Sequence, residues 1–134
     1  MNAGAGSFEL PRTLRAAHEA RSRVAGMLRN SPRSVVDDAL VVVTELVTNS
    51  VRHGPSGAAR SIVVHVTLTE RSIGVRVCDP GHGLDPRTVP HPRDTGGGWG
   101  LVLVQRLATR WGIDTNDQTC VWAEFDLVPA DAAR

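Results

Sequence analysis

The sequence of 134 residues has no tyrosine, few other aromatic side chains and only two cysteines. With 41% hydrophobic residues, its core has to be built mainly from valine, leucine, isoleucine and alanine, which suits a mixed α/β sandwich. The length falls in the commonest range for one domain. We expect a single domain over residues 1–134, ordered from about 7 to 127 between short flexible tails.

Neither positive nor negative charge is in large excess, because the sequence has 15 Lys and Arg residues and 14 Asp and Glu residues. The net charge of +1 supplies no basic footprint for nucleic acid or an anionic membrane, so we expect neither as a partner. No apolar run reaches membrane-spanning length, and the N-terminus lacks the basic and apolar regions of a secretion signal. These absences together predict a cytoplasmic protein.

The two cysteines, Cys78 and Cys120, lie 42 positions apart and show no CxxC spacing. Neither a disulfide framework nor a zinc site is indicated, so we expect reduced structural thiols. His82 and His91 lack a third ligand and are expected to be exposed rather than metal-bound. The GxGxxG and Walker A patterns are also absent, which excludes a Rossmann or P-loop nucleotide site.

Apolar periodicity predicts a strand over 7–10, followed by a helix that ends near Asn30 and has Leu14 on its apolar side. Ser31 followed by Pro32 indicates the start of a second helix. The apolar stripe of this second helix consists of Val36, Ala39, Leu40, Val43, Leu46 and Val47.

Alternating apolar residues predict an antiparallel hairpin over 62–79, and the glycine- and proline-rich stretch 80–98 predicts a long loop. A third helix is expected from Leu101 to about Trp111, before a final hairpin whose second strand covers 119–127. The fold class that follows is α+β: a two-layer sandwich with a mixed, mostly antiparallel sheet and three helices on one face.

Three polar residues of the second helix recur at every fourth position: Glu45, Asn49 and His53. Each step of four leaves a residue only about 40° further round the helix axis, so the three share one face. Taken alone, this row is more typical of an ordinary solvated helix face with i,i+4 pairs than of the wall of a site.

Two glycine-bearing segments follow this helix. The carboxylate of Asp79 can accept a hydrogen bond from an adenine amine, and Gly81 and Gly83 leave the backbone open to a flat ligand, although an ordinary Asp-Pro-Gly turn has the same residues. The third helix is preceded by a run whose backbone amides suit phosphate, although a flexible linker has the same composition. This run is Gly96, Gly97, Gly98, Trp99 and Gly100.

The order and spacing of the three segments carry the specificity. ELVTNSVRHG at 45–54 resembles the N box of GHKL ATPases, DPGHG at 79–83 resembles their DxGxG box, and GGGWGL at 96–101 resembles their second glycine box. The resemblance covers nearly the whole chain, from residue 7 to 127, and implies the Bergerat fold with a flexible ATP lid. Within this superfamily the chain resembles the bacterial anti-sigma-factor serine/threonine kinases.

The resemblance implies ATP and Mg²⁺ as ligands. Asn49 would coordinate Mg²⁺, Asp79 would bind the adenine amine, and Glu45 would act as general base on a partner's serine hydroxyl. The other implied nucleotide contacts are Arg52, His53, Gly81, Gly83, Gly96, Gly97, Gly98, Trp99, Gly100 and Leu101. The implied protein partners are an anti-sigma-factor antagonist of the STAS type and a sigma factor, and the resemblance also suggests a homodimer.

One departure from the kinase pattern lies just before the second glycine box, where anti-sigma kinases carry an arginine and this chain has Gly96. Arg93, three residues earlier, could substitute. Because losing a transition-state cation lowers rate before affinity, the departure bears on phosphoryl transfer more than on nucleotide binding. This departure makes a nucleotide-gated binding module with little catalysis an alternative to a serine/threonine kinase. A detached histidine-kinase catalytic domain that serves another chain is a further alternative.

Overall fold

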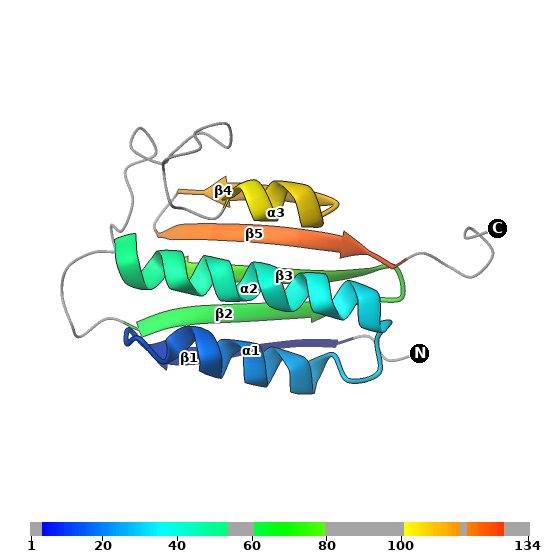
Figure 1. Ribbon diagram of the computed structural model, residues 1–134, viewed down its shortest axis with the longest axis horizontal. Helices are drawn as coiled ribbons and strands as arrows, with labels where there is room; N and C mark the ends of the chain where they lie inside the picture. Colours follow the sequence, from blue (N-terminus) through cyan, green and yellow to red (C-terminus); the bar gives the residue numbers. More distant parts are fainter. Residues whose placement is uncertain (1–3, 54–60, 80–100, 116–117, 128–134) are drawn as a thin grey trace.

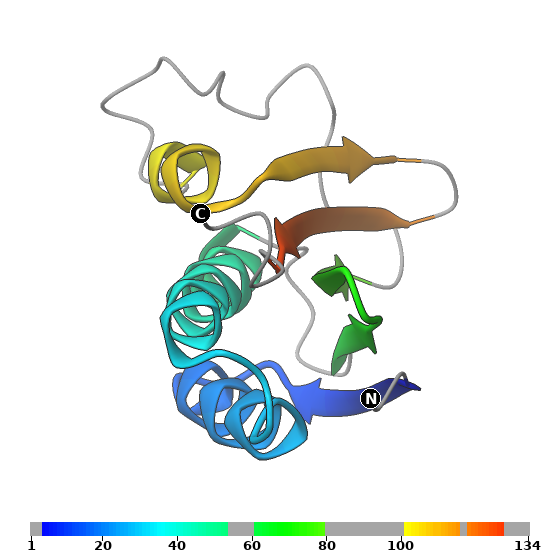
Figure 2. The same cartoon turned by 90° about the vertical axis from the view of Figure 1, so that its right-hand side faces the viewer.

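The computed structural model describes residues 4–53, 61–79, 101–115 and 118–127. The elements of these residues are, in chain order, β1 (Gly4–Pro11), α1 (Ala16–Met27), α2 (Arg33–His53), β2 (Ser61–Leu68), β3 (Ser72–Asp79), α3 (Leu101–Leu107), β4 (Arg110–Asp114) and β5 (Thr119–Asp126). The described strands form one sheet in the order β1-β2-β3-β5-β4, and the described helices form a second layer on one face of it (Figure 1, Figure 2). The predicted α+β two-layer sandwich is confirmed.

The sheet is antiparallel at each of its described strand pairs. The predicted β2–β3 hairpin is present, and in its turn the Thr69 hydroxyl accepts hydrogen bonds from the backbone N–H groups of Arg71 at 3.1 Å and Ser72 at 3.0 Å. β3 occupies the centre of the sheet, between β2 and β5. Its last residue, Asp79, is paired with Thr119 of β5.

The core between the helices and the sheet is aliphatic, as the composition predicts. α2 packs on β3 and also contacts β5, α1 and α3. Its buried apolar residues are Ala39, Leu40, Val42, Val43, Leu46 and Val47, with Val36 half-buried, which confirms the predicted stripe and adds one residue to it. The sheet contributes alternate residues to the same core: Ile62, Val64, Val66, Ile73, Val75 and Val77. No helix in the described part of the chain combines the length and the apolar character needed to cross a bilayer.

The predicted strand over 7–10 is longer in the structure, because β1 begins at Gly4 and ends at Pro11. Its pairing with β2 continues from Pro11 back to Gly4, which is paired with Leu68. The three residues assigned to a flexible tail therefore lengthen an edge strand. Glycine and alanine have little β-propensity of their own, so the partner strand determines this part of the structure.

Two helix boundaries also differ from the prediction. α1 begins only at Ala16, and Leu14 precedes it with its side chain 94% exposed, so Leu14 is not part of the apolar side. α3 ends at Leu107 rather than near Trp111, which lies in β4 together with Gly112. The helix is shorter because its chain has to return as an edge strand beside β5.

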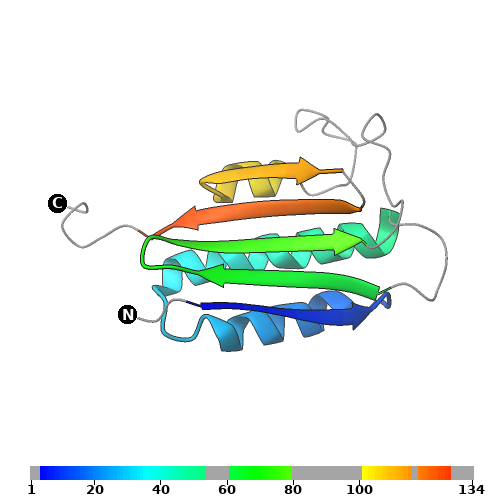
Figure 3. The same cartoon turned by 180° about the vertical axis from the view of Figure 1, so that it is seen from behind.

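The face of the sheet turned away from the helices is seen in Figure 3. Cys78 of β3 and Cys120 of β5 are direct partners across the two strands and form a disulfide, so the predicted reduced thiols are wrong. Further along the same face, a Cβ atom added to Gly112 would lie 2.7 Å from the indole of Trp122. The absence of a side chain at Gly112 is thus what lets this tryptophan lie against the backbone of β4.

Candidate functional site

The buried polar residues of the described chain gather at one end of the sheet. Asn49 and Ser50 are consecutive in the last turns of α2, and Asp79 at the end of β3 is paired with Thr119 of β5, each of the four being 4–7% exposed. Polar side chains are buried far less often than apolar ones, and they need hydrogen-bond partners when they are. Their convergence makes this end of the sheet the candidate site.

The carboxylate of Asp79 is held on both of its oxygens. The Ser50 hydroxyl donates a hydrogen bond to Oδ2, and Nη2 of Arg12 forms an ion pair with Oδ1. Arg12 comes from the turn between β1 and α1, and its side chain is 8% exposed. A charge buried without a partner lowers the stability of a protein by several kcal/mol, roughly as much as breaking a buried ion pair. The Arg12 guanidinium therefore makes a buried carboxylate at position 79 tolerable.

The same arginine also holds the end of α2. Its Nη1 donates to the backbone carbonyl of Ser50, one of the last four carbonyls of a helix that ends at His53. These carbonyls have no partner inside their own helix and form the negative end of its dipole. Arg12 therefore joins the β1–α1 turn, the end of α2 and the end of β3 into one network.

Asn49 lies one helical turn after Glu45 on α2, and the two side chains share a face. Within the described residues the Asn49 amide nitrogen is buried without a hydrogen-bond partner, whereas Glu45 is half-buried. A buried amide with an unused donor fits an external group: the nitrogen can donate to a phosphate oxygen, and a half-turn of the amide offers its oxygen to a cation. This chemistry matches the nucleotide and magnesium that the sequence resemblance implies.

The other predicted site residues are placed less centrally or lie outside the described chain. Arg52 is exposed on α2, Leu101 is buried at the start of α3, and the side chain of His53 is not among those described. Outside the described residues are Gly81, His82, Gly83, His91, Arg93, Gly96, Gly97, Gly98, Trp99 and Gly100. In the described segments, no group of three or more His, Cys, Asp or Glu residues could hold a metal ion.

Arg12, Ser50 and Thr119 are absent from the residues selected in the sequence. Ser50 lies inside the segment that resembles the N box, and this segment indicates the position of Ser50 in a site but not its role. Arg12 follows Pro11 in a turn and belongs to no periodic pattern, so its pairing with Asp79, 67 positions later, becomes visible only in the fold.

Known proteins with similar sequence include the sensor protein QseC of Salmonella typhi and that of Salmonella typhimurium. Each is 33% identical to this chain over 98 residues, an alignment that covers 66% of this chain and 20% of the relative. The chain thus matches about one fifth of the length of these relatives.

Solved structures share the fold over most of the chain. The structure of the RsbU and RsbW domains of Rv1364c from Mycobacterium tuberculosis has a TM-score of 0.71 at 22% identity, covering 92% of this chain and 32% of that one. The histidine kinase domain of the blue-light activated histidine kinase EL346 from Erythrobacter litoralis has a TM-score of 0.56 at 21% identity, covering 88% and 62%. Identities this low establish the fold alone.

The family model described as "Histidine kinase-like ATPase domain" matches residues 10–125, a range that contains the whole Asp79 network. The three boxes, the antiparallel sheet with its helical layer and this match agree, and the chain therefore belongs to the histidine kinase-like ATPase family of the GHKL type.

Proposed function

We propose that this chain is an ATP- and Mg²⁺-dependent regulator that phosphorylates a serine or threonine of a STAS-type anti-sigma-factor antagonist and can sequester a sigma factor. The observation that carries the proposal is the buried amide nitrogen of Asn49, which has no hydrogen-bond partner among the described residues and lies one turn from Glu45, next to Ser50 of the Asp79 network. The resemblance of the three boxes and of the strand-helix opening to anti-sigma-factor kinases supports this type of kinase over a histidine kinase.

Each of the three central residues has one task in this proposal. The Asp79 carboxylate accepts a hydrogen bond from the exocyclic amine of adenine. Asn49 would supply an amide oxygen to magnesium, which when bound neutralises charge on the phosphates. Glu45 takes the proton of the partner's hydroxyl as the hydroxyl oxygen bonds to the γ-phosphorus and the bond to the β–γ bridging oxygen breaks, releasing ADP. A half-buried Glu45 suits this task because the hydroxyl has to reach it from solvent.

The test is phosphoryl transfer from labelled Mg-ATP to a STAS-type antagonist. We expect an acid-stable phosphoserine or phosphothreonine. Glu45→Gln should lower the transfer rate by about 10²- to 10⁴-fold with ATP affinity nearly unchanged, whereas Asn49→Ala should lower ATP affinity as well. Asp37→Asn is the matched control, because Asp37 is an exposed carboxylate on the same helix, and both quantities should stay at the wild-type values.

A nucleotide-gated binding module is a second candidate, favoured by Gly96 at the position where anti-sigma kinases carry an arginine. In that case Mg-ATP changes the affinity for the partner, no phosphate is transferred, and Glu45→Gln leaves the regulation intact. Equal loss of regulation in Glu45→Gln and Asn49→Ala would count against the module and for the kinase.

A histidine-kinase catalytic domain acting on another chain is a third candidate, favoured by the similarity to the sensor protein QseC. It predicts an acid-labile phosphohistidine on the partner in place of the acid-stable product. The homodimer suggested by the resemblance stays a prediction, which the mass in solution would test.

A further inference from the structure

Arg12 belongs to none of the three boxes, yet it is bound to the residue expected to recognise the base. Its guanidinium bonds both to the Asp79 carboxylate and to the Ser50 carbonyl, and it is almost completely buried. Because the helix-end carbonyl is part of the backbone, the guanidinium is fixed from the α2 side and in turn fixes the carboxylate.

The Asp79 carboxylate keeps capacity for a further donor. A carboxylate has about four acceptor positions, two on each oxygen, and within the described residues Arg12 bonds to one oxygen and Ser50 to the other. Its charge is already compensated by Arg12, so a neutral base can bind without bringing a counter-charge of its own. Arg12 therefore does not have to leave for a base to be recognised.

We infer that Arg12 is a positioning residue for base recognition. It orients the Asp79 carboxylate so that one of the remaining lone pairs accepts a hydrogen bond from the exocyclic amine of the purine. The inference rests on the proposed function, because it takes a purine nucleotide as the ligand. Arg12 acts through Asp79 and does not itself contact the base.

The planar guanidinium is required for this task. It bonds to two acceptors at once, the Ser50 carbonyl through Nη1 and Asp79 through Nη2. A lysine at position 12 would keep the charge but present a single rotatable ammonium group, which lacks this fixed fork. Arg12→Lys should therefore keep the free energy of unfolding closer to the wild-type value than it keeps the preference for a base that carries the amine.

The experiment compares two ligands that differ only in the amine: Mg-ATP and the magnesium complex of purine riboside triphosphate. Calorimetry gives the dissociation constant of each ligand, and their ratio isolates the contribution of the amine. For Arg12→Gln we expect the preference for ATP to fall about tenfold or more, the scale of one hydrogen bond to a charged group. The affinity for purine riboside triphosphate should change much less, and Arg12→Lys should give an intermediate ratio.

Two further variants fix the interpretation. Arg110→Gln removes an arginine that is also paired with carboxylates but lies at the opposite end of β5, and the ligand ratio should stay at the wild-type value. Asp79→Asn should lower the ratio by itself, and adding Arg12→Gln to Asp79→Asn should lower it no further, because the two residues act on the same contact.

Equal weakening of both ligands in Arg12→Gln would mean a merely structural role and would overturn the inference, as would an unchanged ratio. Urea unfolding and circular dichroism check that each variant is folded, and if Arg12→Gln is not, Arg12→Lys carries the same comparison. Failure of the wild-type chain to bind ATP would contradict the proposed function itself, whereas ATP binding with a ratio insensitive to Arg12 contradicts this inference alone.

Discussion

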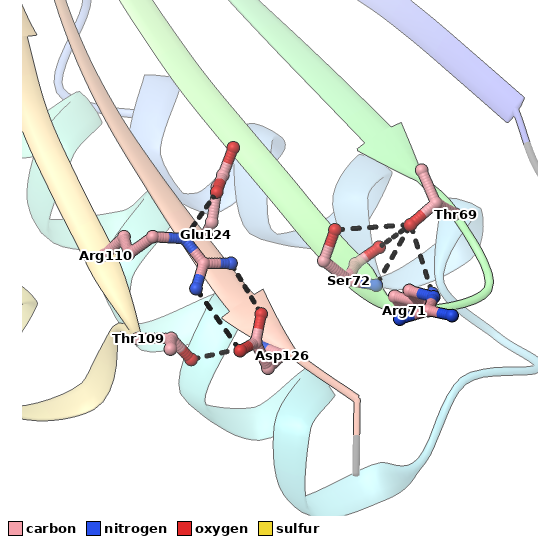
Figure 4. Close-up of polar contacts among 7 residues, drawn as sticks. All are labelled: Thr69, Arg71, Ser72, Thr109, Arg110, Glu124 and Asp126. Carbon is pink, nitrogen blue, oxygen red and sulfur yellow. Dashed lines mark hydrogen bonds and ion pairs between the residues drawn. The ribbon is translucent and has the colours of Figure 1, made fainter. Parts of the chain in front are cut away.

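The two ends of the sheet each hold an arginine paired with carboxylates, in opposite surroundings. At the Asp79 end, the side chains of Arg12 and Asp79 are 8% and 4% exposed. At the other end, Arg110 of β4 bonds to Glu124 at 2.9 Å and to Asp126 at 2.6 Å on β5, and these three side chains are 44–49% exposed (Figure 4).

The comparison shows that the surroundings of an ion pair, rather than its chemistry, decide how much depends on it. Exposed pairs compete with water and salt and contribute little, whereas removing one member of a buried pair leaves the other charge without compensation. The Asp79 end is also closed covalently, since the Cys78–Cys120 disulfide joins the residue before Asp79 to the residue after Thr119. The opposite end has the β2–β3 turn and surface contacts.

The largest effect is expected from the buried pair. Arg12→Met should lower the free energy of unfolding by about 3–5 kcal/mol, because the carboxylate of Asp79 would be left without a cation. The free energy comes from urea denaturation. The double variant Arg12→Met/Asp79→Leu should be more stable than Arg12→Met alone, and a loss no larger than that of Arg110→Met would break the comparison between the two ends.

Loss of the disulfide should rank next. The two cysteines are 42 positions apart, and for a closed loop of that size chain entropy gives a stabilisation of about 4 kcal/mol, with about 2–4 typical. Urea denaturation with and without a thiol reductant measures it. The stability of the variant Cys78→Ser/Cys120→Ser should not depend on the reductant. Equal stability of the oxidised and reduced wild-type chains would be evidence that the disulfide does not stabilise this end of the sheet.

A smaller effect is expected in the β2–β3 turn. Thr69→Val removes the hydroxyl that accepts from the backbone N–H groups of Arg71 and Ser72 (Figure 4), and should cost about 1 kcal/mol. Thr67→Val, an exposed position on β2, serves as the control in the same denaturation series. If the two variants were equally stable, the turn would not depend on this hydroxyl.

The smallest effect concerns acid at the Arg110 end. The hydrogen bond from Arg110 lowers the pKa of Asp126 below its ordinary value of 3.8. Because the folded pKa lies below the unfolded one, this stabilisation is complete above the unfolded pKa and is lost as the pH falls through the lowered value. Thermal melts from pH 5 downwards, with Asp126→Asn for comparison, should differ only slightly, and added salt should reduce the difference further.

The elements predicted from the sequence are those defined by local periodicity. The stripe of α2 and the alternation of β2 and β3 each specify one face within a few residues, so these elements could be found without the fold. Glu45, Asn49 and Asp79 could also be selected without the fold, because their spacing and context match the family boxes, and their roles stay predictions. The glycines of the boxes at 79–83 and 96–101 lie outside the described residues, so their roles stay predictions.

The missed disulfide, strand extension and buried ion pair depend on which parts of the chain become neighbours in the fold. Cys78 and Cys120 face each other only because β3 and β5 pair in this register, and Gly4 is in a strand only because β2 pairs with it. The Arg12–Asp79 pair needs the β1–α1 turn and the end of β3 brought together. Distances along the chain carry no information on such contacts, so sequence reasoning could not supply them.

The position of Arg12 in the turn after β1 has a practical consequence for dissecting the molecule. A fragment beginning at α1 would retain all three family boxes and yet lose both an outer strand of the sheet and the cation that holds Asp79. Such a fragment would pass any motif search while lacking the arginine that we propose positions Asp79 for base recognition. Adding back a synthetic peptide of residues 4–12 in trans would show whether the missing contacts can be restored without a covalent link.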